Sequence, residues 1–330
     1  MSAQALLALL ADGELHSGER LAGELGISRA AVWKHVDALR SSGIDIRARR
    51  RAGYRLAAPV ELLDARLIRR GLQAPQRARL ARLDLLFEVD STNTWLLEAE
   101  RPAGGEAHAA LTELQTGGRG RRGRRWLMPF GRAIALSLSW SFAESPRDLP
   151  ALSLAVGVAV ARALARVGAR GVALKWPNDI WFAGRKAGGI LIEMRAEGAG
   201  PAFVVIGIGL NVSLPERALE GLGPLGVPPA GVEEACAGTC SRNALAGALL
   251  DELLRALPAF EQDGFASFAA EWGELDALRG RPATVMLGGQ QWSGMAEGID
   301  ADGGLLLRVG GERRKFVSGE ASLRPQEGAA

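Results

Sequence analysis

Residues 116–126 read TGGRGRRGRRW and place glycines at 118, 120 and 123 in the pattern G-x-G-x-x-G. The arginines of this stretch are Arg119, Arg121, Arg122, Arg124 and Arg125. Guanidinium groups bind phosphate and carboxylate oxygens through paired hydrogen bonds, so the stretch predicts a flexible loop that folds around an anion. The candidate ligands are a dinucleotide, a nucleic acid, and a polyphosphate combined with a carboxylate.

The flanking sequence tests the dinucleotide hypothesis. A dinucleotide fingerprint needs a strand before the glycines and a helix after them. Residues 109–116, AALTELQT, supply the strand, but residues 126–140 contain a proline and then an alternating strand. The P-loop pattern and the motifs that accompany a kinase glycine-rich loop do not occur. A nucleic-acid patch stays possible, and a polyphosphate with a carboxylate fits the density of arginines best.

The N-terminal residues predict a helix-turn-helix. Residues 2–11 read as a short buried helix, and Ser17 and Ser28 can each cap a following helix. The second of these helices exposes Arg29, Lys34 and His35, which are donors suited to phosphates and base edges.

An arginine-rich hairpin is predicted next, over residues 44–56. Between Arg40 and Arg55 we count six basic residues against one acidic residue, and Arg49 and Arg50 lie at the expected turn. A helical hairpin packed on another domain is the alternative, but it has no need of these charges. We therefore expect a winged-helix DNA-binding domain over residues 1–59, with Ser28, Arg29, Lys34, His35, Arg49 and Arg50 at the DNA.

The remaining chain predicts two further domains. Strands and helices mix over residues 60–278, and short strands separated by Gly and Asp turns fill residues 279–330 as a small β-barrel. The expected strands are 82–92, 109–116, 132–140, 171–184, 185–195 and 203–213. The expected helices are a buried one at 151–168 and amphipathic ones at 242–260 and 265–275. Residues 221–231, rich in Gly and Pro, predict a loop.

Composition excludes several classes of protein. The chain of 330 residues is 48% hydrophobic and 23% charged, with a net charge of +3. We find no uninterrupted apolar run of membrane-spanning length and no basic signal-peptide region, so we expect a cytoplasmic protein without a membrane contact. Cys236 and Cys240 predict reduced thiols, and three scattered histidines do not favour a metal site or a catalytic triad.

Three short segments add candidate site residues. KWPNDIW gathers Lys175, Asn178 and Asp179 in a turn, GRKAGGIL places Lys186 before two glycines, and GIGLN places two glycines in a strand. Glycines in a strand let a flat ligand approach the backbone. Each segment alone also fits a turn former, a solvated lysine or a β-bulge.

Together these segments resemble the biotin–protein ligases. STNTWLLE, LQTGGRGRRGRRW, KWPNDIW, GRKAGGILIE, GIGLNV and the C-terminal GRPATV, GIDADGGLLL and SGEASLR occur in that family's order, over about residues 17–325. The resemblance implies a multidomain α+β fold: a winged helix-turn-helix, a mixed α/β catalytic domain similar to class II aminoacyl-tRNA synthetases, and an SH3-like barrel. It also implies ATP and Mg²⁺ as cofactors, synthesis of biotinyl-5′-AMP, and transfer of biotin to a carrier lysine.

The resemblance assigns roles to individual positions. Biotin would be bound by Ser91, Thr92, Asn93, Gln115, Arg119, Gly120, Arg121, Lys186, Gly189 and Gly209. Catalysis would rest on Lys186, Arg121 and Asp179. The nucleotide would meet Arg122, Asn211 and Arg324, with Asn211 near Mg²⁺. Two positions depart from the family pattern: Ser318 replaces a glycine, and Ala135 stands where an aromatic residue is common.

Partners follow from the same resemblance: a biotin carboxyl carrier protein, operator DNA of biotin genes, and a second copy of the chain when biotinyl-AMP is bound. Two alternatives stay open. A lipoate–protein ligase shares the catalytic fold, and a winged-helix repressor could sense a small acid without performing chemistry.

Overall fold

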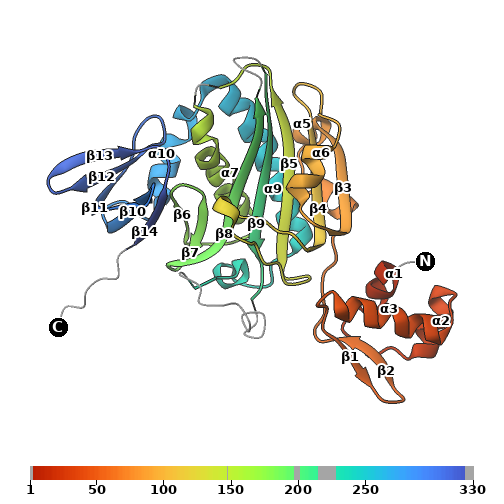
Figure 1. Cartoon of the computed structure of the whole chain (residues 1–330). Coiled ribbons are helices and arrows are strands. Elements are labelled where there is room, and N and C mark those ends of the chain that lie inside the picture. The colour runs from red at the N-terminus through yellow and green to blue at the C-terminus, as the bar shows by residue number, and fades with distance from the viewer. Residues whose placement is uncertain (1–2, 147, 197–200, 215–227, 324–330) are drawn as a thin grey trace, which may run out of the picture.

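The computed structural model describes residues 3–146, 148–196, 201–214 and 228–323. Figure 1 shows three parts in chain order: a small helical part at the N-terminus, a central sheet backed by helices, and a second, smaller sheet at the C-terminal end. This arrangement confirms the predicted multidomain α+β fold.

The N-terminal part is a winged helix-turn-helix. Its elements are α1 (Ala3–Leu10), α2 (Gly18–Leu25), α3 (Arg29–Ser41), β1 (Ile46–Arg49) and β2 (Gly53–Leu56). Ser17 and Ser28 cap α2 and α3 as predicted, since their hydroxyls accept hydrogen bonds from the N–H groups three residues later. Gly26 adopts φ 63° and ends α2, which turns the chain into the second helix. Strands β1 and β2 pair as the wing.

A seven-stranded sheet forms the centre, in the order β3-β4-β5-β9-β8-β7-β6. Its strands are β3 (Leu80–Val89), β4 (Ala107–Gln115), β5 (Ala133–Phe142), β6 (Val172–Lys175), β7 (Asp179–Phe182), β8 (Arg185–Ala196) and β9 (Ala202–Asn211). β3 and β4 are parallel and all the other neighbouring pairs are antiparallel.

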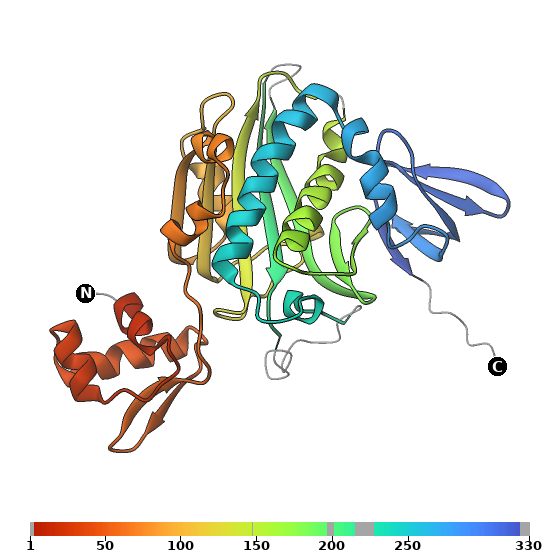
Figure 2. The same cartoon turned by 180° about the vertical axis from the view of Figure 1, so that it is seen from behind.

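Helices α7 (Leu152–Arg166) and α9 (Arg242–Asp263) cover one face of this sheet (Figure 2). The apolar residues between the helices and the sheet form the main core. The short helix α6 (Thr92–Glu98) contacts β4, β5 and β9. The other helices are α4 (Ala65–Arg70), α5 (Ala74–Arg79) and α10 (Ala266–Leu275).

Two predictions about these elements were wrong. Residues 171–184 form a hairpin of two strands, because the Trp176–Asn178 turn reverses the chain and pairs Lys175 with Asp179. Helix α9 is buried on most of its surface, including Asp251 and Glu252, so it is not amphipathic. Buried α7 agrees with prediction, although Leu149–Arg166 is by length and composition apolar enough to cross a membrane; two-thirds of it is buried within the protein, as in a core helix.

The C-terminal part is a five-stranded antiparallel sheet in the order β13-β12-β11-β10-β14. Its strands are β10 (Pro282–Leu287), β11 (Gln290–Ile299), β12 (Leu305–Val309), β13 (Glu312–Phe316) and β14 (Glu320–Leu323). Its core is continuous with that of the central part. Trp176 Nε1 donates to the carbonyl of Gly303 at 3.0 Å and ties the two parts together.

A buried polar cluster anchors the winged helix to the central sheet. Arg242, 2% exposed, begins α9 and donates to the Glu113 carboxylate on β4, to the backbone carbonyl of Glu61, and to the backbone carbonyl of Ala133 on β5. The N–H of Leu63 donates to the same Glu113 carboxylate at 2.6 Å. These bonds pair the buried charges of Arg242 and Glu113 and fix the chain that leaves the winged helix, while Arg242 Nη2 has no hydrogen-bond partner among the described residues.

Candidate functional site

A cavity of about 610 Å³ lies beside α6, where the 116–126 loop meets strands β5, β8 and β9. Residues of β14 complete its wall, so the C-terminal part contributes to the same cavity as the central sheet. A concave site with both apolar and polar lining residues is the usual setting for a small ligand.

One end of the cavity is a hydrogen-bonded cluster around the N-terminus of α6. Ser91 caps α6, which turns Thr92 and Asn93 toward the sheet. Ser137 Oγ lies 2.7 Å from Thr92 Oγ1 and 2.6 Å from Asn93 Oδ1, and Gln115 Oε1 accepts from the N–H of Thr92 at 3.0 Å. Ser91, Thr92, Asn93 and Ser137 are almost fully buried and Gln115 is half-buried, and these hydrogen-bonded groups can recognise the polar head of a ligand.

Two glycines of β9 make room on the sheet side. A Cβ atom at Gly207 would lie 2.4 Å from Asn93 Oδ1, and one at Gly209 would lie 2.6 Å from the Trp126 ring. A side chain at either position would therefore displace Asn93 or Trp126. Trp126 Nε1 is buried without a hydrogen-bond partner in the described residues, and the Trp126 ring lines the cavity.

A lysine–aspartate–lysine cluster lies at the other end. Asp179 accepts a hydrogen bond from Lys186 Nζ at 2.6 Å through Oδ1 and one from Lys175 Nζ at 3.2 Å through Oδ2. Burial raises the pKa of Asp179, but the two ammonium groups outweigh it and the pKa lies below its usual range. Burial lowers the pKa of Lys175, which also lies over the Trp181 ring. The cluster carries a net positive charge in a partly desolvated place.

The loop arginines are held by partners around the cavity. Arg121 donates to Asn178 Oδ1 at 3.1 Å, and its pKa is lowered by burial and by nearby Arg122. Arg119 lies 3.0 Å from Glu193, whose carboxylate also accepts from Asn93. Several cationic groups therefore line the cavity. This geometry fits the prediction that the 116–126 loop binds an anion.

Two ion pairs to one carboxylate join the loop to the C-terminal part. Arg124 forms one with Glu320 of β14, and Arg122 lies 3.9 Å from the same carboxylate. The loop itself folds back, because the N–H of Trp126 donates to Gly118 O at 2.8 Å. As predicted, no helix follows the glycines; a single 3-10 turn occupies Arg121–Gly123.

Most of the predicted ligand-binding residues line this one cavity. They are Ser91, Thr92, Asn93, Gln115, Arg119, Gly120, Arg121, Asp179, Lys186, Gly189, Gly209 and Asn211. Arg122 is not among the lining residues, and Arg324 lies outside the described residues. Asn211 is buried and donates to the Ala230 carbonyl at 3.3 Å.

Several residues of the site were given no role in advance. Lys175 was named with Asp179 in the KWPNDIW segment, and its i,i+4 spacing from that aspartate was the available signal for a role. Glu193 and Glu320 stand in the segments GRKAGGILIE and SGEASLR but were given no role, and Ser137 stands in an ordinary strand and carries no local signal. Tertiary structure alone brings them to the cavity.

The predicted DNA-binding residues gather on the winged helix. Arg29, Lys34, Arg49 and Arg50 are exposed, His35 is half-buried, and Ser28 serves as the cap of α3. Charged side chains therefore occupy both the second helix and the wing, which are the two elements that contact DNA in winged helices.

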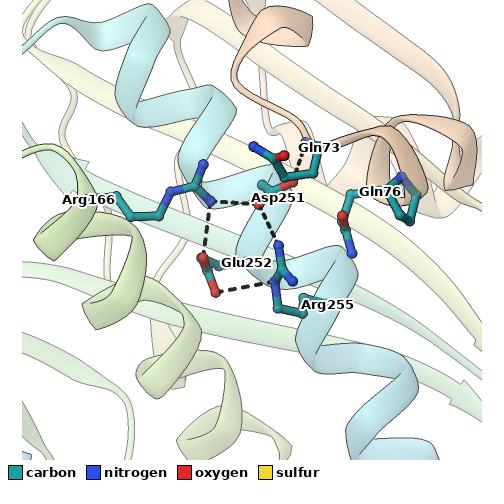
Figure 3. A pocket seen from close by; sticks show the side chains of 7 residues that line it. Gln73, Gln76, Arg166, Asp251, Glu252 and Arg255 are labelled. Atoms are coloured by element: carbon teal, nitrogen blue, oxygen red, sulfur yellow. Dashed lines mark hydrogen bonds and ion pairs between the residues drawn. The ribbon is translucent and has the colours of Figure 1, made fainter.

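A second hollow, on the helical side, is a structural ion-pair network (Figure 3). Arg166 donates to Asp251 at 2.6 Å and to Glu252 at 3.0 Å, and Arg255 donates to Asp251 at 3.2 Å. The N–H of Gln73 donates to the other oxygen of Asp251 at 2.7 Å. The network joins α7 and α9 to the chain between α4 and α5.

No group of three or more His, Cys, Asp or Glu side chains suited to a metal occurs in the part of the chain that the structure describes. An Mg²⁺ ion that accompanies a nucleotide does not need such a cage, since phosphate oxygens and waters supply most of its ligands.

Comparison with known proteins agrees with the three-part architecture. Residues 2–55 match the HTH domain family, residues 87–211 the Biotin/lipoate A/B protein ligase family, and residues 280–324 the Biotin protein ligase C terminal domain. The chain is 39% identical over 326 residues to the Bifunctional ligase/repressor BirA of Escherichia coli, covering 98% of this chain and 97% of that protein. This chain belongs to the biotin protein ligase family.

Other members of the biotin protein ligase family match a shorter region. The Biotin--[acetyl-CoA-carboxylase] ligase of Mycobacterium tuberculosis is 35% identical, with 72% of this chain and 87% of that protein covered. The solved structure of the Aquifex aeolicus biotin protein ligase in complex with biotin and ATP is 27% identical. It matches with a TM-score of 0.60 over 74% of this chain and 99% of that one.

Proposed function

We propose that this protein activates biotin with ATP to biotinyl-5′-AMP, transfers biotin to a lysine of a biotin carboxyl carrier protein, and represses biotin genes. The observation that carries the proposal is one cavity with three kinds of lining. It has the polar cluster at the start of α6, the glycines of β9, and the lysines around Asp179. Membership of the biotin protein ligase family and the N-terminal helix-turn-helix support both activities.

The polar cluster suits the biotin head group. The ureido ring of biotin is flat and carries both N–H donors and a carbonyl acceptor. Ser91, Thr92, Asn93 and Gln115 offer complementary groups, and Gly189 and Gly209 leave space for the rings and chain. This end of the cavity therefore orients the carboxylate toward the lysines.

The cationic end suits the chemistry of adenylation. A carboxylate attacks the α-phosphate of ATP and releases pyrophosphate, which brings two anions together. Lys186 and Arg121 can contact both groups and stabilise the added negative charge in a partly dry site. Neither residue has to move a proton, so no histidine is needed.

Mg²⁺ bound with the nucleotide would neutralise its phosphates. Asn211 fits beside such an ion, because its Nδ2 donates to the Ala230 carbonyl and its Oδ1 is the atom that could face the ion in the cavity. Arg122 and Arg324 are proposed at the nucleotide, and the 116–126 loop would close over the mixed anhydride and exclude water.

Transfer of biotin from biotinyl-AMP would bring the acceptor lysine of the carrier protein near Asp179. Since two lysines keep the pKa of Asp179 low, its carboxylate is a poor base. We assign it to orienting Lys186 and to accepting a hydrogen bond from the incoming amine.

Repression assigns the winged helix to operator DNA, through Ser28, Arg29, Lys34, His35, Arg49 and Arg50. One winged helix makes few base contacts, so we propose a homodimer that forms when biotinyl-AMP is bound. The domains would span residues 1–59, 60–278 and 279–330. The protein would act in the cytoplasm.

Pyrophosphate release with biotin and ATP tests the enzyme function. We expect release with biotin and little with lipoate. Preference for lipoate would indicate the lipoate ligase instead, and binding of biotin without pyrophosphate would indicate a sensor that performs no chemistry.

A further inference from the structure

Trp33 is exposed on the helix that faces DNA. The chain contains eight tryptophans, and Trp33 has the highest exposed fraction, 56%. Trp95, the next most exposed at 38%, is held by a hydrogen bond from Nε1 to Asp84 at 2.8 Å. In the part of the chain described, Trp33 has no hydrogen bond and joins no hydrophobic cluster. Leaving a large aromatic side chain in water has no benefit for folding.

The neighbours of Trp33 indicate what it contacts. Arg29, Trp33 and Asp37 are spaced four residues apart and lie along one side of α3. Trp33 falls within the first two turns of the second helix, where recognition helices contact base edges. The wing arginines and Lys34 supply the phosphate contacts around it.

Asp37 indicates that this side of α3 contacts DNA bases and not phosphates. Its carboxylate is exposed and forms no ion pair within the described residues, so it would repel a phosphate. A carboxylate in the major groove can instead accept from the amino group of cytosine, and an apolar side chain can contact the thymine methyl group.

We propose that Trp33 is a specificity-determining residue of the DNA site, which packs its ring against thymine methyl groups in the major groove. This inference rests on the proposed repressor function. It goes beyond that function by assigning the base and the chemical group that are read.

The test begins with duplexes enriched from a randomised library by the full-length chain in the presence of biotin and ATP. In the enriched duplex each thymine is then replaced by deoxyuridine, which removes only the methyl group. We expect the wild-type chain to bind roughly fourfold more weakly for each contacted methyl removed. Trp33→Ala should bind both duplexes equally, and Trp33→Phe should recover part of the difference.

Two control variants separate this role from others. Lys34→Ala should weaken binding to thymine and uracil duplexes alike and reduce the salt dependence. Leu67→Ala, which removes a comparably exposed apolar side chain from α4, should change nothing. Trp33→Ala should bind the uracil duplex with wild-type affinity, which shows that its winged helix is folded, and a wild-type rate of biotin adenylation shows that its catalytic part is folded.

Each other result overturns the proposal. If Trp33→Ala keeps the wild-type sensitivity to uracil, Trp33 does not read the methyl group while DNA binding stands. If Trp33→Ala changes only the oligomeric state, the residue is a protein contact. If the wild-type chain enriches no sequence, the repressor function and the role of Trp33 are both wrong.

Discussion

Lys186 Nζ lies 2.6 Å from Asp179 Oδ1, and Lys175 occupies the second oxygen of the same carboxylate. One half-buried aspartate thus holds two lysines at the edge of the cavity. The aspartate can share Lys186 with an incoming anion, because Lys175 continues to balance its charge.

Replacing Lys186 with Met should lower the rate of biotinyl-AMP synthesis by about 10²-fold or more, since the site loses a charged donor to the developing negative charge. Pyrophosphate release measures the rate. Lys315→Met is the matched control, because Lys315 also lies 2.6 Å from an aspartate, Asp300, but far along the chain in β13. Equal rates in the two variants would remove Lys186 from the mechanism.

Gly207→Ala should raise the KM for biotin about ten- to hundredfold, which corresponds to roughly 1.4 to 2.8 kcal/mol of binding energy. The new methyl group would lie 2.4 Å from Asn93 Oδ1 and displace Asn93 from Ser137. Steady-state kinetics measure the change. Gly104→Ala, with no atom within 4 Å of the added Cβ, should behave as wild type.

Arg121→Gly should release biotinyl-AMP about ten- to hundredfold faster, because charge-assisted hydrogen bonds contribute about 1.5 to 3 kcal/mol each. A stopped-flow chase of preformed adenylate measures this rate. Arg121→Lys keeps the charge but not the planar fork, so it should fall between the two. An unchanged dissociation rate in Arg121→Gly contradicts the clamp.

The pH dependence of stability should report Asp276. Burial raises the pKa of Asp276 from 3.8 to about 6, although the N–H of Leu278 donates to it. The folded state therefore binds the proton more tightly, and this contribution to stability is lost as the pH rises from 3.8 through 6. At 1.36 kcal/mol per pKa unit the loss is on the order of 2 to 3 kcal/mol.

Asp276→Asn removes this titration. Its Tm should match that of the wild-type chain near pH 4 and exceed it near pH 7, as measured by thermal unfolding across that range. A constant difference in Tm between the two proteins would show that Asp276 does not titrate as described.

Deleting residues 1–58 should abolish operator binding and leave adenylation detectable. The truncation has a cost in stability, because the winged-helix core extends onto Leu114, with Phe87 and Phe130 packed against it. Gel-shift titrations at fixed salt should also show tighter binding by the full chain with biotin and ATP. Equal affinity with and without them would leave a ligase with a passive DNA-binding arm.

Local sequence signals predicted the elements that depend on local chemistry. Ser17, Ser28 and Gly26 carry capping signals, and the helix-turn-helix follows from them. Periodicity failed for α9, because its polar residues are paired inside the protein: Asp251 is fully buried against Arg166 and Arg255. A pattern of polar and apolar residues cannot distinguish such pairs from a solvated face.

The candidate site shows the same limit. Its glycines and Lys186 stand in distinctive short segments, whereas Ser137 stands in an ordinary strand and reaches the cavity only through the pairing of β5 with β9. Residues 171–184 were predicted as one strand, because the residues on both sides of the turn have strand composition, but the turn predicted at KWPNDIW is present and divides them into β6 and β7. Pairing partners distant in sequence decide these features.

The cluster around Arg242 bears on how the winged helix is oriented relative to the central sheet. Arg242 holds the backbone of Glu61 and that of Ala133 at once, and Ala133 is paired with Asn211 at the cavity. The winged helix projects to one side of the central part (Figure 1). A small rotation of the chain at the Arg242 cluster would displace the winged helix by an amount that grows with distance from Arg242. The spacing between the two recognition helices of a dimer would therefore be tuned at a residue that touches neither DNA nor biotin.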